Sequence, residues 1–111
     1  MTLIDYDAVP VCGFPWIHWT AANIPGNIAE IPGNASEIKP FQMVQGHNSF
    51  VSPLGGQKDP KIIHQYAGPT QPDKDHDYTL TVYALDEEMN LTDGFFLNEL
   101  LKEMEGHIVA E

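Results

Sequence analysis

Residues 15–25 read PWIHWTAANIP, and this stretch decides the class of fold. The segment 16–24 is rich in aromatic and β-branched side chains, and Pro25 and Gly26 close it, which is typical of a β-strand that ends in a turn. His18 stands inside this apolar run. Because a buried imidazole without a hydrogen-bond partner costs about 1–3 kcal/mol, we expect His18 either to be satisfied by a neighbour or to face a cleft.

Further strands are predicted on both sides of this stretch. The segments 2–5 and 78–85 carry strand patterns, and the second, YTLTVYAL, is the strongest in the chain. Between them, 25–72 holds most of the prolines and glycines and is predicted to be loop-rich, with at most short strands at 41–44 and 61–64. A long irregular segment in a compact domain tends to be functional.

The C-terminal part of the chain predicts a helix that packs on the sheet. Thr92 is the expected N-cap, Asp93 suits the positive end of the helix dipole, and Gly106 is expected to end the helix. His107 is expected at the surface or at the cap. Apolar residues at helical spacing form the expected packing face: Phe96, Leu97, Leu100, Leu101, Met104 and Ile108.

Composition limits the possible partners. The chain has 111 residues, of which 42% are hydrophobic, so residues 1–111 can form a single domain with a core. It has 5 basic residues, all lysine, against 16 acidic ones, and its formal net charge is −11. This balance argues against nucleic acid as a partner and against charge-driven binding to an anionic membrane surface. An acidic surface most often serves solubility.

Cysteine content and hydropathy point to the cytoplasm as the default location. The lone cysteine, Cys12, excludes an internal disulfide. No charged start precedes a long apolar run, so neither a signal peptide nor integral membrane association is predicted.

Side chains two apart on a strand share a face. Three pairs with this spacing stand at the ends of the predicted strands: Asp5 and Asp7, Trp16 and His18, and His76 and Tyr78. If they converge at one end of a sheet, they form a small polar pocket with an aromatic wall. A single histidine on a strand is usually a satisfied core or edge residue, whereas three pairs together favour a site.

Three kinds of chemistry are open to such a pocket. A metal site lacks HxH or HExxH spacing and cysteine ligands, so no metal and no cofactor are predicted. A hydrolase with His18 or His76 as base lacks a serine or cysteine in a recognisable nucleophile motif. An anion pocket remains: imidazoles donate N–H bonds, and the backbone of YAGPT at 66–70 can approach a ligand closely at Gly68. Because the chain has no arginine, anion binding is expected to be modest and to strengthen as the pH falls toward the histidine pKa.

Several segments carry a resemblance to a known family. Residues 5–10 read DYDAVP, 16–19 read WIHW, 47–50 read HNSF, and 66–86 read YAGPTQPDKDHDYTLTVYALD. Together they closely resemble the phosphatidylethanolamine-binding protein family, which includes the Raf kinase inhibitor protein, plant flowering regulators and many small bacterial and archaeal members. The resemblance keeps order and spacing from about residue 3 to residue 107 and is therefore specific.

The resemblance implies a set of ligand-binding residues. In that family, the DPDAP, WxH and HRY motifs and a glycine-proline loop line a pocket for phosphate-like groups such as a phosphoethanolamine head group. Here Tyr6 replaces the proline between the two aspartates, and Asp77 replaces the arginine of HRY, which adds negative charge beside the pocket. Carried over to this chain, the ligand-binding set is Asp5, Asp7, Trp16, His18, Tyr66, Gly68, Pro72, His76 and Tyr78.

The resemblance also implies a fold: a mostly-β sandwich of this family with a C-terminal helix. Family members carry a segment before DPDAP and a last strand after the GHIVA-like stretch. The chain is therefore expected either to be a short member that lacks outer strands at both ends or to be a fragment of a longer protein. A short member would expose sheet edges and core surface, which favours a homo-oligomer.

Three functions follow from these expectations. The first is a non-enzymatic protein that binds a small anionic or phosphorylated ligand in the pocket. The second is a regulator that inhibits a protein partner, such as a kinase or a hydrolase, through the loops around the pocket. The third is a weak hydrolase or metal-dependent enzyme that uses the same aspartates and histidines.

Overall fold

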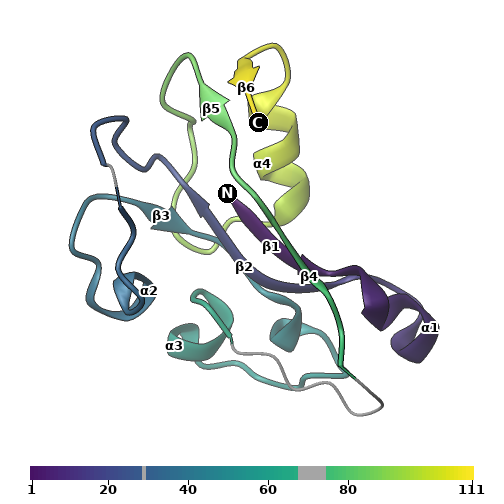
Figure 1. Cartoon of the computed structure of the whole chain (residues 1–111). Helices are drawn as coiled ribbons and strands as arrows, with labels where there is room; N and C mark the ends of the chain where they lie inside the picture. Colours follow the sequence, from purple (N-terminus) through teal and green to yellow (C-terminus); the bar gives the residue numbers. More distant parts are fainter. Residues whose placement is uncertain (29, 68–74) are drawn as a thin grey trace.

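The computed structural model describes residues 1–28, 30–67 and 75–111, and Figure 1 shows its elements. In chain order they are β1 (Thr2–Asp5), a 3-10 turn (Tyr6–Ala8), α1 (Val9–Cys12), β2 (Trp16–Ala22), α2 (Ala35–Ile38), β3 (Val44–Gln45), a 3-10 turn (Ser49–Val51), α3 (Pro60–Ile63), β4 (Tyr78–Thr81), β5 (Ala84–Leu85), α4 (Leu97–Met104) and β6 (Ile108–Ala110).

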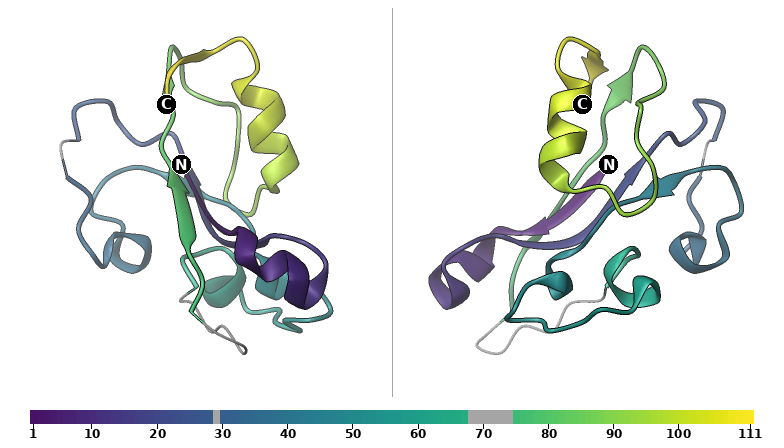
Figure 2. Two further views of the ribbon diagram at one scale, coloured as in Figure 1. Left: turned by 45° about the vertical axis from the view of Figure 1, so that its right-hand side comes forward. Right: turned by 180° about the vertical axis from the view of Figure 1, so that it is seen from behind.

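The strands form two sheets. An antiparallel sheet has the order β3-β2-β1-β4, and a two-stranded sheet pairs β5 with β6. Figures 1 and 2 show α4, β5 and β6 at one end of the molecule and α1 and α3 at the other. The prediction of a mostly-β chain with a C-terminal helix is confirmed. Among the described helices, none is long and apolar enough to cross a lipid bilayer.

Two cores lie on the two faces of the larger sheet, because neighbouring residues of β2 point to opposite faces. Ala21 belongs to a cluster with Met1 and Met43. Ala22 belongs to the other cluster, in which Leu100 and Met104 of α4 pack on the sheet together with Met89 and Phe95 from the chain before the helix. These contacts anchor the sheet on which the candidate site is built.

A β-bulge interrupts the pairing of β1 with β2. The Cα partners pass from Leu3 and Trp19 to Ile4 and Ile17, so His18 is the extra residue and has no partner on β1. A bulge bends its strand and changes the direction of the side chain at that point. The histidine that interrupts the apolar run in the sequence is thus also the residue that interrupts the strand pairing.

Three of the expected strands differ from the structure. The segment 61–64 was predicted as a short strand, but Pro60–Ile63 form α3. The side chain of Asp59 accepts a hydrogen bond from the backbone N–H of Lys61, and Pro60 occupies the first turn, which are both signals of a helix start. The predicted strand 78–85 is divided into β4 and β5, and the expected strand at 41–44 shares only Val44 with β3.

The C-terminal helix is shorter than predicted. It begins at Leu97, and Thr92 is not its N-cap; instead the side chain of Glu99 accepts a hydrogen bond from the backbone N–H of Phe96. On the expected apolar face, Leu100 is buried whereas Leu101 is 47% exposed. Gly106 has a φ of +79° just after the helix end, the left-handed conformation expected of it.

Candidate functional site

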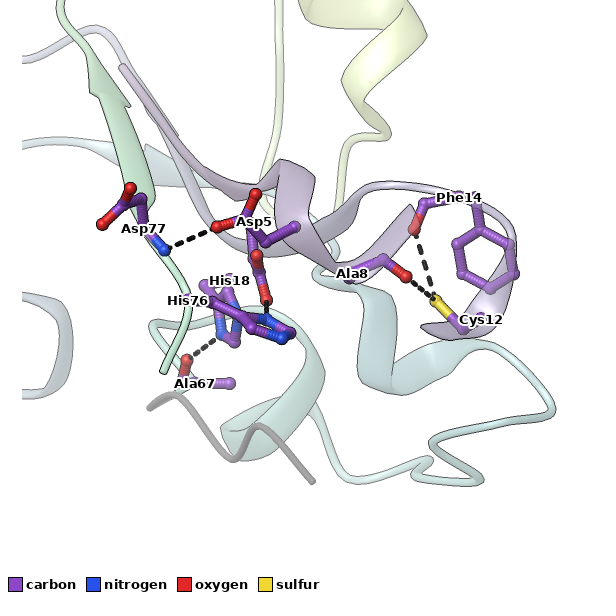
Figure 3. Close-up of polar contacts among 9 residues, drawn as sticks. Asp5, Ala8, Cys12, Phe14, His18, Ala67, His76 and Asp77 are labelled. Atoms are coloured by element: carbon purple, nitrogen blue, oxygen red, sulfur yellow. Dashed lines mark hydrogen bonds and ion pairs between the residues drawn. The ribbon is translucent and has the colours of Figure 1, made fainter. Parts of the chain in front are cut away.

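A cavity lies at the end of the sheet where β1 runs into the turn before α1. Its volume is about 330 Å³. Figure 3 shows Asp5, His18 and His76 gathered there, each from a different part of the chain. The lining residues are Asp5, Ala8, Val11, Cys12, Trp16, His18, Phe50, Leu54, Gly55, Gln57 and His76.

The register of the sheet brings the carboxylate and one imidazole together. Asp5 pairs with Tyr78 at the end of β4, and His76 precedes that strand by two residues. Nδ1 of His76 lies 2.6 Å from Oδ2 of Asp5, and both side chains are buried. The second oxygen, Oδ1 of Asp5, is buried and has no hydrogen-bond partner among the residues that the structure describes. A buried acceptor left in this state is costly unless a ligand or water fills it.

The other imidazole answers the question that the sequence raised about His18. His18 is 3% exposed, and its Nδ1 lies 2.8 Å from the backbone oxygen of Ala67. A carbonyl oxygen only accepts, so Nδ1 carries the proton, and Nε2 of the neutral ring is an acceptor. The ring of Tyr78 meets that of His18 edge-on, with centroids 5.3 Å apart. His18 is therefore satisfied by a neighbour and also lines a cleft.

Asp7 lies outside the strand geometry from which it was predicted. Its 3-10 turn ends the alternation of faces at Asp5, so Asp7 is exposed and does not line the cavity. The side chain of Asp7 instead accepts a hydrogen bond of 2.9 Å from the backbone N–H of Asp77. Asp7 thus joins the start of β4 to the end of β1.

An aromatic wall closes one side of the cavity. Trp16 stacks on Phe14 with ring centroids 6.2 Å apart and meets Phe50 edge-on at 5.3 Å. Ser49 ties this wall to β2, because its Oγ accepts a hydrogen bond of 2.7 Å from the backbone N–H of Ile17. The aromatic wall predicted from Trp16 is present in this form.

Several lining residues carry no periodic or motif signal in the sequence. They come from α1 and from the chain around the second 3-10 turn, where no periodic pattern marks an element: Ala8, Val11, Cys12, Phe50, Leu54, Gly55 and Gln57. The pair Val9-Pro10 suits the first turn of a helix and is the signal that could have indicated α1. Phe50 belongs to the HNSF segment, which is part of the family resemblance but has no strand or helix pattern of its own.

The remaining predicted site residues do not line the cavity in the described structure. Tyr66 is 46% exposed and packs edge-on against Trp19, with ring centroids 6.1 Å apart. Tyr78 touches the site through His18 rather than by lining the cavity. Gly68 and Pro72 lie outside the described residues.

The electrostatic environment of the site is negative. Burial raises the pKa of the Tyr78 phenol above its ordinary value, and the nearby carboxylates of Asp5, Asp75 and Asp7 raise it further. An anion that enters the cavity must therefore be compensated by protons on imidazoles or on the anion itself.

The donor set of the site limits its chemistry. No group of three or more histidine, cysteine or acidic side chains in the described part of the chain is arranged to hold a metal ion. The single S–H of Cys12 has two acceptors within reach, the backbone oxygens of Ala8 and Phe14, at 3.4 and 3.3 Å (Figure 3). The cavity can accept hydrogen bonds through Asp5 and His18 and, once His18 is protonated, donate one to an anion.

Comparison with known sequences identifies related proteins. The whole chain, residues 1–111, matches the family described as phosphatidylethanolamine-binding protein. YxkA of Bacillus subtilis, described as uncharacterised, is 68% identical over 111 residues, which are 100% of this chain and 66% of that protein. A UPF0098 protein of Pyrococcus abyssi is 40% identical over 112 residues, which are 96% of this chain and 56% of that protein. The chain thus spans between about half and two thirds of the length of these relatives.

A solved structure shares the fold. The crystal structure of a phosphatidylethanolamine-binding protein homologue from Chlamydia trachomatis matches with a TM-score of 0.73 and 29% sequence identity, over 98% of this chain and 63% of the other. The match confirms the fold that the sequence resemblance implied.

Proposed function

This chain belongs to the phosphatidylethanolamine-binding protein family, and on that premise we propose that it binds a small anionic, phosphate-like group, free or as a phosphorylated head group, without catalysing a reaction. One observation carries the proposal. Asp5 lines the cavity beside the two imidazoles of His18 and His76, and its Oδ1 is a buried acceptor that has no partner among the described residues. A ligand with a donor at that point removes the cost of leaving this atom unsatisfied.

The hydrogen-bonding capacity of the cavity defines which ionic form of the ligand fits. Oδ1 of Asp5 accepts a hydrogen bond, and Nε2 of His18 donates one only when that ring is an imidazolium. A singly protonated phosphate group meets both conditions, because its O–H donates to Asp5 and its anionic oxygens accept from His18. A fully ionised phosphate fits less well, because it has no O–H to donate to Asp5 and both of its negative charges meet the Asp5 carboxylate.

Binding is therefore coupled to protons. As the pH falls toward about 6, the second ionisation of a phosphorylated group, the singly protonated fraction of the ligand rises. The affinity rises with it. No arginine contributes a fixed positive charge, so the affinity at neutral pH is modest.

NMR titration of the histidine ring signals tests this proposal. Inorganic phosphate and phosphoethanolamine are added to the protein at about pH 5.5 and about pH 7.5, on either side of the ordinary histidine pKa. We expect the ring signals of His18 and His76 to shift with millimolar ligand, more strongly at the lower pH. If neither ring signal moves, the proposal fails.

Variants make the test specific. His18→Gln lacks the imidazolium donor, and we expect its affinity for phosphate at the lower pH to fall at least about tenfold. His107→Gln is the matched control, because His107 directly precedes β6, and β6 lies at the opposite end of the molecule from α1 (Figure 1). Equal losses in both variants would indicate binding by general charge and not by the cavity.

A second candidate function has its own observation. Exposed apolar side chains line the cavity or stack on its aromatic wall: Val11 is 44% exposed, Leu54 64%, and Phe14, which stacks on Trp16, 38%. Such a surface suits a protein partner, such as a kinase or a hydrolase, that is inhibited through these loops. Inhibition of a kinase panel by the wild-type chain that is lost with Leu54→Asp but kept with Leu101→Asp would support it. Equal inhibition by both variants would place the interface elsewhere.

A further inference from the structure

A second pair of histidines lies outside the cavity. His47 follows β3 and His64 follows α3, and their Nε2 atoms are 3.0 Å apart. Both rings are half-buried, so they remain in reach of solvent. Neither residue lines the candidate ligand cavity, so the pair has no part in the proposed function.

The ring of His47 is fixed in one orientation and one tautomer. Its Nδ1 lies 2.6 Å from the backbone oxygen of Gly94, and its ring stacks flat on Phe96, with centroids 4.2 Å apart and an interplanar angle of 1°. Because the carbonyl only accepts, Nδ1 carries the proton and the lone pair of the neutral ring is on Nε2. That lone pair is on the atom nearest His64. Metal-binding histidines commonly donate their other ring N–H to a backbone carbonyl in this way.

The ring of His64 is held against the same short segment. A Cβ atom added to Gly94 would lie 2.9 Å from Cε1 of His64, so the ring rests directly on the glycine backbone. Gly94 also has a φ of +86°, a conformation that favours glycine. One residue therefore positions both imidazoles, one through its carbonyl and one through its missing side chain.

We propose that His47 and His64 form a two-histidine site for a divalent ion of the Cu²⁺ or Ni²⁺ type, bound through both Nε2 atoms. Metal–imidazole bonds are about 2.0–2.1 Å long. Two ligands at right angles around one ion then stand about 2.9 Å apart, and two ligands at the tetrahedral angle stand about 3.4 Å apart. The observed 3.0 Å fits the right angle of square-planar or octahedral coordination, which Cu²⁺ and Ni²⁺ favour, better than the tetrahedral angle of zinc.

The surroundings of the pair favour a cation. Asp93 precedes Gly94, and its carboxylate favours positive charge at the ring of His64, although burial and then His47 lower the pKa of that ring. The formal net charge of −11 also draws cations toward the surface. In the described part of the chain no third histidine, cysteine or acidic side chain completes a ligand set, so water fills the remaining positions and the ion exchanges freely. When no ion is bound, one of the two Nε2 atoms carries a proton and donates a hydrogen bond to the other.

Titration of the untagged protein with Cu²⁺, followed by electron paramagnetic resonance, tests the site. We expect one equivalent to bind with the hyperfine coupling of two imidazole nitrogens. In His64→Gln the coupling of one nitrogen should remain, and the affinity should fall at least about tenfold. His107→Gln serves as the control and should bind like the wild type, because His107 is hydrogen-bonded to Asp86 and lies far from the pair in sequence.

A second measurement needs no substitution and tests the two-histidine site even if His64→Gln fails to fold. Paramagnetic Ni²⁺ broadens NMR signals near its site, and the ring signals of His47 and His64 should broaden together before those of any other histidine. Earlier broadening at His18, His76 or His107 would overturn the proposal. So would Cu²⁺ binding that does not saturate, or an affinity that is unchanged in a folded His64→Gln variant.

Discussion

The Nδ1 atom of His76 lies 2.6 Å from Oδ2 of Asp5, although the two residues are 71 positions apart in the sequence. This contact joins the end of β1 to the chain just before β4, and both side chains are almost fully buried. A buried ionisable pair of this kind is weak evidence of net stabilisation, but removing one partner leaves the other without its match. The pair therefore links the integrity of the cavity to the stability of the sheet.

The substitution Asp5→Ala tests this link. It leaves the ring N–H of His76 without its acceptor in a buried site, so we expect the free energy of unfolding to fall by about 1–3 kcal/mol. Urea denaturation followed by circular dichroism measures the change. Asp7→Ala is the matched control: Asp7 is exposed and bonds one backbone N–H, so its loss should cost less than about 1 kcal/mol. Equal costs would show that burial of the Asp5–His76 pair does not govern stability.

Strand register explains why part of the candidate site could be predicted from the sequence. Asp5 pairs with Trp16 on β2 and with Tyr78 on β4, so three predicted strand ends meet at the same end of the sheet. The strong strand patterns at 16–24 and 78–85 therefore carried spatial information about side chains far apart in the chain. This is how His18 and His76 could be expected near Asp5 before any coordinates.

The same reasoning fails where the backbone leaves the strand. Asp7 was placed beside Asp5 by the two-residue period, but the chain turns into a 3-10 helix after Asp5 and the period no longer applies. His18 lies at a bulge, which no pattern of apolar residues reveals. The cavity wall from Phe50 to Gln57 comes from irregular chain, whose position depends on contacts such as that of Ser49 with Ile17.

The phenol of Tyr78 predicts a loss of stability at alkaline pH. Burial, and then the neighbouring carboxylates, raise its pKa above 10.0, so the folded state holds this proton more tightly than the unfolded state. Stability is therefore unaffected below about pH 10 and decreases as the pH rises from there through the raised pKa. Urea denaturation at several alkaline pH values should show this slope.

Two variants identify which tyrosine causes the loss of stability at alkaline pH. The pKa of Tyr83 is raised as well, chiefly by burial, so Tyr78→Phe should reduce the slope and the double variant with Tyr83→Phe should reduce it further. The ultraviolet absorbance of tyrosinate follows the ionisation of the tyrosines directly. A slope that is the same in Tyr78→Phe and in the wild type would contradict the assignment.

His107 predicts a dependence of the same sign at a lower pH, near neutrality. Its hydrogen bond to Asp86, 2.8 Å long, raises its pKa above 6.5, and the charges of Glu87, Asp86 and Glu103 act in the same direction. Because the folded pKa is the higher one, the stabilising contribution is complete below about pH 6.5 and is lost as the pH rises through the folded value.

An NMR titration of the His107 ring signal measures this shift. Asp86→Asn should return the pKa of His107 toward 6.5, because the amide retains a hydrogen-bond acceptor but not the charge. The backbone hydrogen bond from the N–H of Asp86 to the oxygen of His107 does not depend on the side chain and should persist. A pKa that stays equally high in Asp86→Asn would assign the shift to the glutamates.

Core packing of α4 gives a prediction about stability alone. Leu100 is 1% exposed and Leu101 is 47% exposed, although the two are neighbours on one helix. Leu100→Ala should lower the free energy of unfolding by about 2–5 kcal/mol through lost burial and a cavity in the cluster with Ala22 and Phe95. Leu101→Ala on the same helix should cost less than about 1 kcal/mol. Similar costs would mean that the helix packs through a different face.

Gly94 and Gly106 form a matched pair that separates backbone strain from steric contact. Both have positive φ, +86° and +79°, so alanine is strained at either position, by about 1–2 kcal/mol. Only at Gly94 does the added Cβ meet another residue, at 2.9 Å from the ring of His64, whereas at Gly106 no described atom lies within 4 Å. Gly94→Ala should therefore destabilise the protein more than Gly106→Ala, and it should shift the ring signals of both His64 and His47 in NMR spectra. Equal destabilisation with unmoved ring signals would show that the histidine pair does not rest on this glycine and would remove the basis for its fixed geometry.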